Sequence, residues 1–302
     1  MRLKSNAVNL NYLLSIAVLA EERHFVRAAA RLGISQSALT QQVQRIEREL
    51  GLTLFSRTQR QVVITEAGKA FVEEARRVLT QYDIAIDAAR RASKGEIGKL
   101  RLGFVENAAL HLLPRTVSRF RRHHPHVRLE LNELISAQLV QALQEETLDA
   151  ALMRPIAGLD ALKTMTLLRE PYQVALPADH PLAQKTAIAF ADIVTDGMII
   201  APAKKSTYLL SVFRPLCERH NVEFTIAQEV EQLHAIIGLV GAGLGYTLLP
   251  RSAAALSIEG VVYRPLADPE APQAELVLAW SANATNPVLN NFLAVARDAS
   301  RQ

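Results

Sequence analysis

The hydrophobic pattern of the chain changes its period near residue 95. Up to Ser93 the apolar residues recur at helical spacing, whereas Leu100–Val105 is a continuous strand-like run. Between them, the segment Ser93–Lys99 holds two glycines and four polar residues, which is typical of a linker. We therefore expect an all-helical first third joined to an α/β remainder. The length of 302 residues is enough for two or three domains, and 49% apolar with 21% charged residues is the composition of a globular protein.

Positive charge is concentrated in the helical third. Residues 1–93 hold 14 Lys and Arg against 9 Asp and Glu, while residues 94–302 hold 20 against 21. This excess indicates either a surface for a polyanion or a solvated basic face. The single cysteine, Cys217, excludes an internal disulfide and a multi-cysteine metal site. The most apolar window, 235–250, is shorter than a membrane span and contains four glycines, so we expect a cytoplasmic protein.

An amphipathic helix over residues 36–50 follows a shorter helix and a tight turn at Gly33. Its apolar residues are spaced by four, three and four positions and form one buried stripe, with Ser35 as the N-cap. The opposite face carries amides and hydroxyls, which can pair with base edges in a major groove. This arrangement predicts a helix-turn-helix, and the alternative is a plain helical hairpin. The expected DNA-contacting residues of this helix start are Ser35, Gln36, Ser37, Thr40, Gln41 and Gln44.

Several arginines flank this helix. Arg45 and Arg48 can reach phosphates or fold back as structural ion pairs, and the sequence leaves both open. Arg57 and Arg60 lie in a polar segment before the β-type run 62–64, which predicts a small hairpin wing or, alternatively, a solvated loop. We expect Arg31, Arg57 and Arg60 to contact phosphates.

A third, long helix begins after Thr65, with Thr65 as its cap. Its apolar residues follow a near-heptad spacing that leaves a narrow seam, and such a seam needs a partner helix. The same helix of a second subunit is the most economical partner, and it would present two recognition helices at a fixed spacing. The expected dimerisation residues are Phe71, Val78, Tyr82 and Ala85.

At this point the chain resembles a known family. The runs 25–43, 46–51, 54–58 and 64–68 are similar in residue type and spacing to the winged helix-turn-helix and linker helix of the LysR-type transcriptional regulators. Ser37 stands where the family commonly has proline, and His24 where it commonly has serine. The resemblance implies binding to an interrupted palindrome in double-stranded promoter DNA, dimers or tetramers of the chain, and RNA polymerase as a further candidate partner.

The remainder of the chain alternates strands and helices. Strands over 100–105, 127–134 and 149–153, with helices over 110–123 and 138–145 between them, predict a parallel sheet covered on both faces. A second such unit runs from Tyr172 to Leu266. The final strand 274–280 and helix 287–297 are expected to return to the first lobe.

Ligands bind beyond the carboxyl ends of strands in open α/β sheets. That rule selects four loops, 106–108, 135–137, 154–155 and 202–207, the last of which precedes a helix expected to begin at Leu209. Two of them precede helices, whose free N–H groups favour an anion. Arg154 and Ser136 can complete a carboxylate clamp, whereas Glu106 opposes an anion unless it points away or pairs with a cation. The alternative interpretation is that Lys204 and Lys205 are solvated loop residues and bind no anion. The expected effector-binding residues are Asn107, Ala108, Ser136, Arg154, Pro202, Lys204, Lys205, Ser206 and Thr207.

This half resembles the LysR-type effector domain more loosely, through segments such as 102–104, 148–151 and 238–245. The resemblance implies two Rossmann-like lobes with a fold like that of periplasmic binding proteins, and a small-molecule effector, expected to be a carboxylate. Gly103–Val105 and Arg154 look closest to the branch that senses aromatic or muconate-type carboxylates. Ser136 fits the hydroxyl pattern of that branch, and Asn107 departs from it.

Other constellations do not support catalysis or a metal. The segment 241–245 follows a helix and precedes a strand, the reverse of a dinucleotide loop, so it is interpreted as a helix end with close backbone packing. His123, His124 and His126 lack nearby carboxylates, and no nucleophile motif is present, so we expect no metal, no cofactor and no enzyme activity.

The predicted organisation is an all-α winged helix-turn-helix domain over 1–65, a linker and dimerisation helix over 66–94, and an effector domain over 95–302. Within the last, lobe I covers 95–169 and 269–302, and lobe II covers 170–268. We expect a nucleoid-associated transcriptional regulator. The alternative is a solute-binding or enzymatic α/β protein whose N-terminal helices serve only for dimerisation.

Overall fold

The computed structural model describes residues 9–57, 62–156 and 159–300. The described chain forms two compact units that divide between Arg90 and Arg91. We describe each unit by itself. Among the described helices, none is both long and apolar enough to cross a membrane. The predicted boundaries at residues 65 and 94 stay predictions.

The first unit begins with three helices, α1 (Leu10–Glu22), α2 (Phe25–Leu32) and α3 (Gln36–Leu50). Each start is capped by a side chain: the Asn9 amide accepts from Asn11 N, His24 Nδ1 from Arg27 N, and Ser35 Oγ from Ala38 N. Imidazole thus does at His24 what serine does at an ordinary N-cap. Between α2 and α3, Gly33 has a φ of 67°, a left-handed conformation that glycine adopts without a Cβ penalty. The predicted helix-turn-helix geometry is confirmed.

A two-stranded wing follows. Strands β1 (Phe55–Arg57) and β2 (Val62–Ile64) pair antiparallel, with Phe55 opposite Ile64. The carboxylate of Glu47 on α3 accepts hydrogen bonds from Leu54 N at 2.7 Å and Phe55 N at 3.1 Å, which fixes where the wing leaves the helix. A negative charge satisfies these two backbone donors better than a neutral group would.

The long helix α4 (Glu66–Ser93) starts where the sequence predicts, because Thr65 Oγ1 accepts from Gly68 N at 2.9 Å. The first turns of α4 pack on the core of the first unit, burying Val72 and Ala75. Farther along, Val78 and Tyr82 are 48% and 49% exposed. The helix therefore changes from a packed element to one that leaves an apolar seam open.

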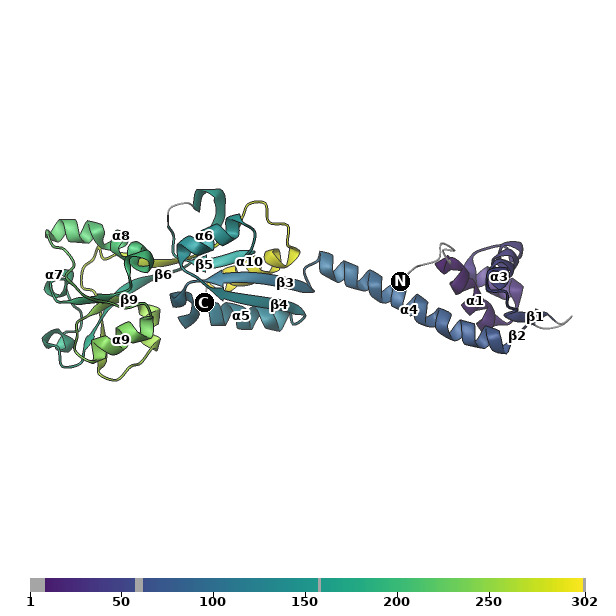
Figure 1. Ribbon diagram of the computed structural model, residues 1–302, viewed down its shortest axis with the longest axis horizontal. Helices are drawn as coiled ribbons and strands as arrows, with labels where there is room; N and C mark the ends of the chain where they lie inside the picture. The colour runs from purple at the N-terminus through teal and green to yellow at the C-terminus, as the bar shows by residue number, and fades with distance from the viewer. Residues whose placement is uncertain (1–8, 58–61, 157–158, 301–302) are drawn as a thin grey trace. The chain divides into compact units, whose positions relative to one another are not determined.

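The second unit contains two lobes. In lobe I, β3 (Gly98–Phe104) pairs in parallel with both β4 (Val127–Glu133) and β5 (Ala150–Met153), which confirms the predicted parallel sheet. Figure 1 shows α6 (Ser136–Gln144) on one face of this sheet, and α5 (Leu112–His123) with α10 (Pro287–Ala299) on the other. As predicted, β11 (Gln273–Ser281) returns to lobe I, where it pairs antiparallel with β5.

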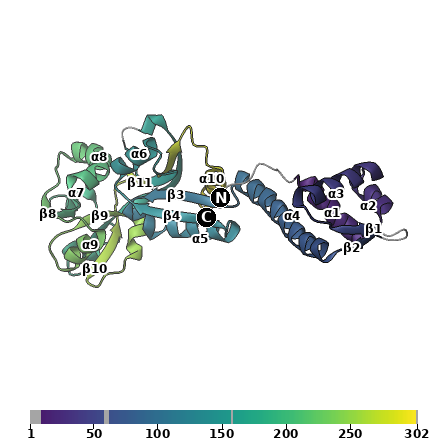
Figure 2. The same cartoon turned by 45° about the vertical axis from the view of Figure 1, so that its right-hand side comes forward.

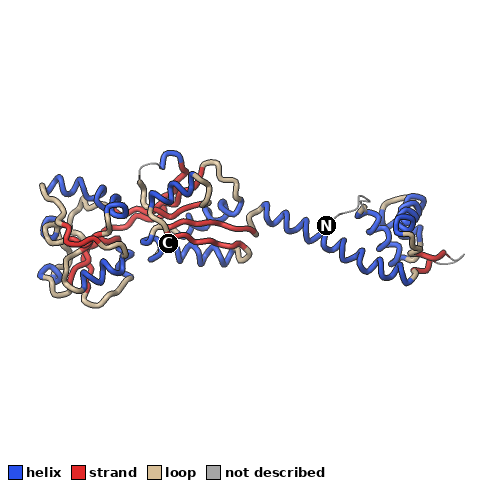
Figure 3. Tube along the Cα trace, viewed as in Figure 1, coloured by secondary structure: helices blue, strands red, loops and turns tan. Residues whose placement is uncertain are grey.

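A single long strand, β6 (Leu162–Pro177), runs through both lobes, as the continuous red segment in Figure 3 shows. Its first half pairs with β11 in lobe I, and its second half pairs with β10 (Val261–Pro265) and β9 (Thr247–Pro250) in lobe II, all antiparallel. The expectation that lobe II repeats a parallel sheet is thus wrong for these strands. Strand β10 and the first half of β6 were not predicted from the sequence. The first half of β6 mixes exposed and buried positions without a clean alternation, so its period is hidden.

The remaining elements of lobe II include β7 (Met198–Ile200) and β8 (Ile226–Glu229), which pair in parallel, the short α7 (Phe190–Ile193), and the helices α8 (Ala203–His220) and α9 (Leu233–Gly241) (Figure 2). Four 3₁₀ helices complete the described secondary structure: η1 (Glu106–Leu110), η2 (Leu159–Ala161), η3 (Pro181–Gln184) and η4 (Arg251–Ala255).

One predicted loop is instead the start of a helix. The segment 202–207 was expected to precede a helix beginning at Leu209, but α8 begins at Ala203. Lys205 N and Ser206 N donate to the carbonyl of Pro202 at 2.8 and 3.1 Å. Proline without an N–H is well tolerated at a helix start, and here its carbonyl opens the helix.

The histidines, the cysteine and the glycine-rich segment to which the sequence assigns no catalytic or metal-binding role make contacts that stabilise the fold. His124 stacks on Phe120 at 4.7 Å between ring centroids, and His123 Nδ1 lies 2.8 Å from the carbonyl of Arg119. Cys217 packs against the core of lobe II, and burial raises the pKa of its thiol. A Cβ on Gly245 would overlap the carbonyl oxygen of Gly197, which confirms close backbone packing in the segment 241–245.

Candidate functional site

The outward face of α3 is polar and uncharged in its first half. Leu39, Val43 and Ile46 are buried at 0%, 1% and 2% exposure, so the opposite face of the helix is turned outward. Amide and hydroxyl side chains on such a face both donate and accept hydrogen bonds, as base edges require. Of the predicted DNA-contacting residues on this helix, Thr40 is half-buried, and the exposed ones are Gln36, Ser37, Gln41 and Gln44.

Local hydrogen bonds already use part of this surface. Ser35 Oγ lies 2.9 Å from Ser37 Oγ while it caps the helix, so its first task is structural. Arg45 Nε pairs with Glu49 at 3.0 Å, and Arg48 Nε donates to the carbonyl of Gln44 at 3.2 Å. Of the two alternatives that the sequence left open for these arginines, the structure has them folded back onto α3.

Arg31, predicted to contact phosphate, is held by carboxylates in this structure. Its guanidinium lies 2.7 Å from Glu21 and 3.2 Å from Glu22 on α1. The hydrogen bonds that Arg31 donates to these two carboxylates raise its pKa. Glu21 also pairs with Arg76 of α4 at 2.9 Å, so the ion pairs join three helices. A phosphate would have to compete with them.

The structure describes only some of the residues that were predicted for the wing, and it exposes most of those predicted for dimerisation. Arg57 ends β1, whereas Arg60 lies outside the described residues. Phe71 packs in part against the core of the first unit, while Val78, Tyr82 and Ala85 are exposed on α4.

Lobes I and II enclose a cavity of about 650 Å³. Lobe I contributes η1, the start of α6 and the residue after β5, and lobe II contributes the first turns of α8 and the segment before α9. Two predicted residues do not line this cleft. Ala108 is fully buried in the core of lobe I, and Pro202 is the N-cap residue of α8. The predicted residues that the structure brings together are Asn107, Ser136, Arg154, Lys204, Lys205, Ser206 and Thr207.

Arg154 is the most distinctive group in the cleft. It is 8% exposed, and among the described residues no carboxylate forms an ion pair with it. Its Nη1 donates to the carbonyl of Glu275 at 2.7 Å, and its guanidinium carbon lies 5.7 Å from the ring centre of Tyr208. Burial lowers the pKa of Arg154, but an arginine stays protonated in proteins. A buried cation without a carboxylate partner leaves a strong demand for an anion.

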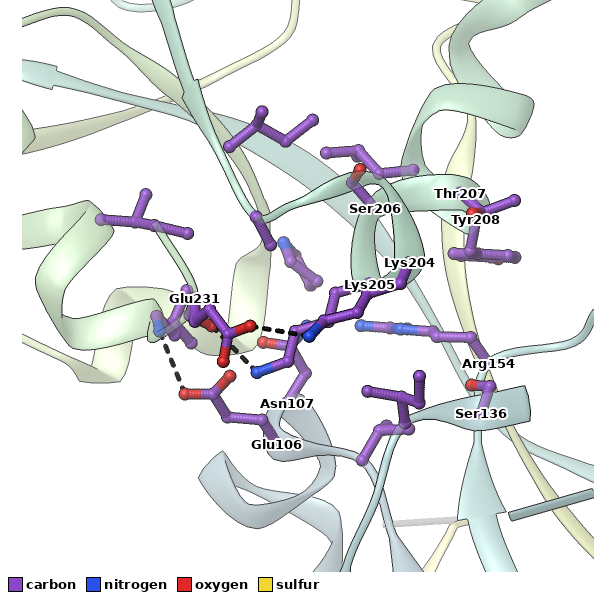
Figure 4. A pocket seen from close by; sticks show the side chains of 18 of the residues that line it. Glu106, Asn107, Ser136, Arg154, Lys204, Lys205, Ser206, Thr207, Tyr208 and Glu231 are labelled. Carbon is purple, nitrogen blue, oxygen red and sulfur yellow. Dashed lines mark hydrogen bonds and ion pairs between the residues drawn. The ribbon is translucent and has the colours of Figure 1, made fainter. Parts of the chain in front are cut away.

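The two lysines are less free than the predicted clamp requires. Lys204 Nζ pairs with the carboxylate of Glu231 at 2.8 Å, and Lys205 Nζ donates to the carbonyl of the same residue at 3.0 Å (Figure 4). These contacts lower the pKa of Glu231 and partly neutralise the ammonium groups. The lysines are therefore neither loop residues nor unpaired.

Glu106 has a defined partner as well. Its Oε1 accepts from Leu233 N at 3.1 Å, at the start of α9. Of the two resolutions that the sequence suggested, pointing away or pairing with a cation, the structure has neither, because the partner is a backbone N–H. This bond joins lobe I to lobe II.

The cleft residues that were not predicted from the sequence include Tyr172, Tyr208 and Glu231. Tyr172 lies in the middle of β6 and Tyr208 within α8, so neither follows a strand end, where the loop rule looks. Tyr208 Oη accepts from Glu275 N at 3.0 Å, beside the carbonyl that holds Arg154. Of these residues, only Glu231 could have been found from the sequence, because an acidic residue ahead of an apolar helix is typical of a helix start.

Two protein-family models match the chain. "Bacterial regulatory helix-turn-helix protein, lysR family" covers residues 10–69, and "LysR substrate binding domain" covers residues 93–301. The chain belongs to the LysR family.

Curated relatives of this LysR-family chain match along nearly its whole length. The uncharacterized HTH-type transcriptional regulator YnfL of Escherichia coli K12 is 36% identical over 287 residues, which cover 94% of this chain and 96% of YnfL. The HTH-type transcriptional regulator AlsR of Bacillus subtilis 168 is 36% identical over 290 residues, 96% of this chain and 95% of AlsR.

A solved structure has the same fold. Full-length CbnR, determined in complex with its target DNA, superimposes with a TM-score of 0.84 over 97% of this chain and 99% of CbnR at 23% identity. The LysR-family chain is thus a DNA-binding transcriptional regulator with an effector-binding domain of two lobes, and not an enzyme.

Proposed function

We propose that this regulator recognises an interrupted palindrome in promoter DNA through α3 of two or four subunits, and that a small carboxylate in the cleft changes how it does so. Closure of two lobes around a ligand can bias an equilibrium between two arrangements of the subunits. RNA polymerase is a candidate partner at the promoter.

The observation that carries the effector half is Arg154. A guanidinium that is 8% exposed, with no ion pair to any described carboxylate, is best satisfied by a bound carboxylate, which it can hold through two parallel hydrogen bonds. Ser136, at the first position of α6, adds a hydroxyl and a helix N-terminus to the same cavity. Because Gly103–Val105 and Arg154 resemble the branch of the family that senses aromatic or muconate-type carboxylates, we extend the proposal to an effector of that class.

The DNA half is supported by the exposed amides of α3 and by the fold shared with CbnR, which was solved with its target DNA. Genome-wide footprinting at moderate salt should give a few sharp pseudo-palindromic sites. On such a site, Gln41→Ala should lose about 1–3 kcal/mol of specific binding free energy, while non-specific binding stays nearly unchanged.

Titrating Gln41→Ala and wild-type protein on the site and on a scrambled duplex measures the specific and the non-specific binding free energies. The charge of the protein does not change in this variant, so the salt slope should be the same. An equal loss on both duplexes would contradict a base-reading role for Gln41.

The effector half is tested at Arg154. Arg154→Met keeps an unbranched apolar stem but removes the guanidinium and its charge, so it should abolish stabilisation by carboxylates without changing affinity for DNA. Thermal unfolding with a carboxylate panel, beside DNA titration, measures both. Stabilisation of Arg154→Met equal to that of wild type would exclude Arg154 as the anion site.

A further inference from the structure

The charges that line the cleft balance before any ligand is bound. Three cations and three carboxylates line it (Figure 4 labels all but Glu133): Arg154, Lys204, Lys205, Glu106, Glu133 and Glu231. A monocarboxylate bound at Arg154 would leave one net negative charge in this partly enclosed space. A dicarboxylate would leave two, at a cost that the low local dielectric increases.

The chain itself occupies the second place where an anion would bind. The first N–H groups of a helix have no partners within the helix, so the N-terminus of α9 would attract an anion, as would the positive end of its dipole. Glu106 from lobe I lies there, with its Oε1 at 3.1 Å from Leu233 N. A second carboxylate on the ligand would meet Glu106 rather than a free helix end.

The neighbouring residue needs a donor. Asn107 Oδ1 is buried in the wall of the cleft and has no hydrogen-bond partner within the described structure. Leaving a buried carbonyl-type oxygen unpaired is costly, so a ligand that donates a hydrogen bond here gains affinity. In Figure 4, Arg154 enters the cavity from one side, and Glu106 lies on the opposite side, with Asn107 beside it.

Lys204 and Lys205 do not neutralise the negative charge of Glu106, because both are bound to Glu231. The first shares its charge with the Glu231 carboxylate and the second is bound to the Glu231 carbonyl, both within lobe II. The cleft is therefore polarised, with a cation that has no ion pair among the described residues on one side and hydrogen-bond acceptors on the other.

We propose that Glu106 makes this cleft selective for monocarboxylates that carry a hydrogen-bond donor, a hydroxyl or an ammonium group, away from the carboxylate, and selects against dicarboxylates. The inference rests on the proposed function, since it takes Arg154 as the site of the first carboxylate. It narrows the proposed effector class to donor-bearing monoacids, which keeps aromatic monocarboxylates in that class and removes the muconate-type dicarboxylates.

Two matched series of acids test it on the full-length protein by isothermal titration calorimetry. One comprises benzoate, 3-hydroxybenzoate, 3-(aminomethyl)benzoate and isophthalate, and the other valerate, 5-hydroxyvalerate, 5-aminovalerate and glutarate. In at least one series, we expect the wild type to bind a donor-bearing monoacid at least about tenfold more tightly than the parent acid and the diacid. The hydroxyl and ammonium members distinguish the two kinds of donor.

The variant Glu106→Gln separates charge from structure. A glutamine oxygen can still accept from Leu233 N, so the bond between the lobes is kept while the negative charge is removed. The affinity for the diacid should rise by at least about tenfold, and the advantage of the ammonium compound should shrink. Glu130→Gln, which removes one negative charge from β4 outside the cleft, is the matched control and should change neither.

The outcomes distinguish the two proposals. If the diacid binds wild type best and its binding is lost in Arg154→Met, the selectivity assigned to Glu106 is wrong and the carboxylate site stands. If Glu106→Gln leaves all ratios unchanged, the selectivity is likewise overturned. If no acid in either series binds wild type in an Arg154-dependent manner, the carboxylate site and the selectivity both fail.

Discussion

At the scale of single residues, two arginines of the effector domain have opposite surroundings. Arg101 on β3 donates three hydrogen bonds to the carboxylate of Asp149: from its backbone N at 2.6 Å, its Nη2 at 2.9 Å and its Nε at 3.2 Å. Arg154 is more deeply buried and forms no ion pair with a carboxylate of the described residues. The fold itself completes the pair of Arg101, whereas we propose that a bound effector supplies the anion for Arg154.

The Asp149 pair predicts a dependence of stability on pH. Burial alone would raise the pKa of Asp149, but the side-chain and backbone hydrogen bonds from Arg101 outweigh it and lower the pKa. The carboxylate therefore stabilises the fold fully above the ordinary pKa of about 3.9, and this contribution is lost as the pH falls through the lower folded value. Asp149→Asn should cost about 1.5–3 kcal/mol at pH 7, as a lost hydrogen bond to a charged group does.

Thermal unfolding of wild type and Asp149→Asn between pH 7 and pH 3 measures this difference, which should be constant above pH 5 and shrink toward pH 3. Asp160→Asn, at an exposed position in η2, is the control and should be close to neutral. A gap between Asp149→Asn and wild type that is as large at pH 3 as at pH 7 would contradict the electrostatic origin.

At the scale of elements, the joint between the wing and α4 depends on one close approach. Thr65 Oγ1 donates to the carbonyl of Thr53 at 2.8 Å and accepts from Gly68 N, so the first turn of α4 lies against the segment that leads into β1. A Cβ on Gly68 would overlap the carbonyl oxygen of Leu54 and meet Ile64 at 2.8 Å. Backbone cannot yield there as a flexible side chain would.

Gly68→Ala should therefore destabilise the first unit by about 1–3 kcal/mol, although alanine is the better helix former by about 1 kcal/mol. Gly238→Ala on α9 is the matched opposite case, because nothing lies within 4 Å of a Cβ there. It should be neutral or slightly stabilising. Urea unfolding of both variants measures the signs, and a stabilised Gly68→Ala would show that the joint opens without cost.

At the scale of the whole molecule, each unit has its own hydrophobic core, so assembly depends on what the units leave exposed. On α4, Val78 and Tyr82 are about half exposed, one turn apart on the same face. Apolar side chains at such spacing on a long helix are typical of a helix–helix interface.

The double variant Val78→Asp with Tyr82→Asp should therefore dissociate the oligomer, because burying two carboxylates against a copy of themselves is strongly unfavourable. Sedimentation velocity at micromolar concentration measures the loss. Thr80→Asp, exposed on the other side of α4, adds one of the same charges and should sediment as wild type does. A double variant that keeps the wild-type mass would place the interface elsewhere.

Local patterns in the chain were enough for the elements that carry DNA recognition. The 4-3-4 spacing of Leu39, Val43, Ile46 and Leu50 predicts which face of α3 is turned outward, and Ser35 and Thr65 predict where two helices begin. These features depend on neighbours within a few residues, so they can be read without the fold.

Partners far apart in the sequence could be decided only by the tertiary structure. Arg154 is held by a residue 121 positions away, and Glu106 reaches Leu233 across 127 positions, so no spacing rule pairs them. The direction of β9 and β10 against β6 likewise depends on how the chain returns, which strand propensity does not encode. The outward face of α3 thus follows from local periodicity, whereas the polarity of the cleft arises when long-range folding leaves Arg154 without an ion pair to a described carboxylate and gives Glu106 a backbone partner.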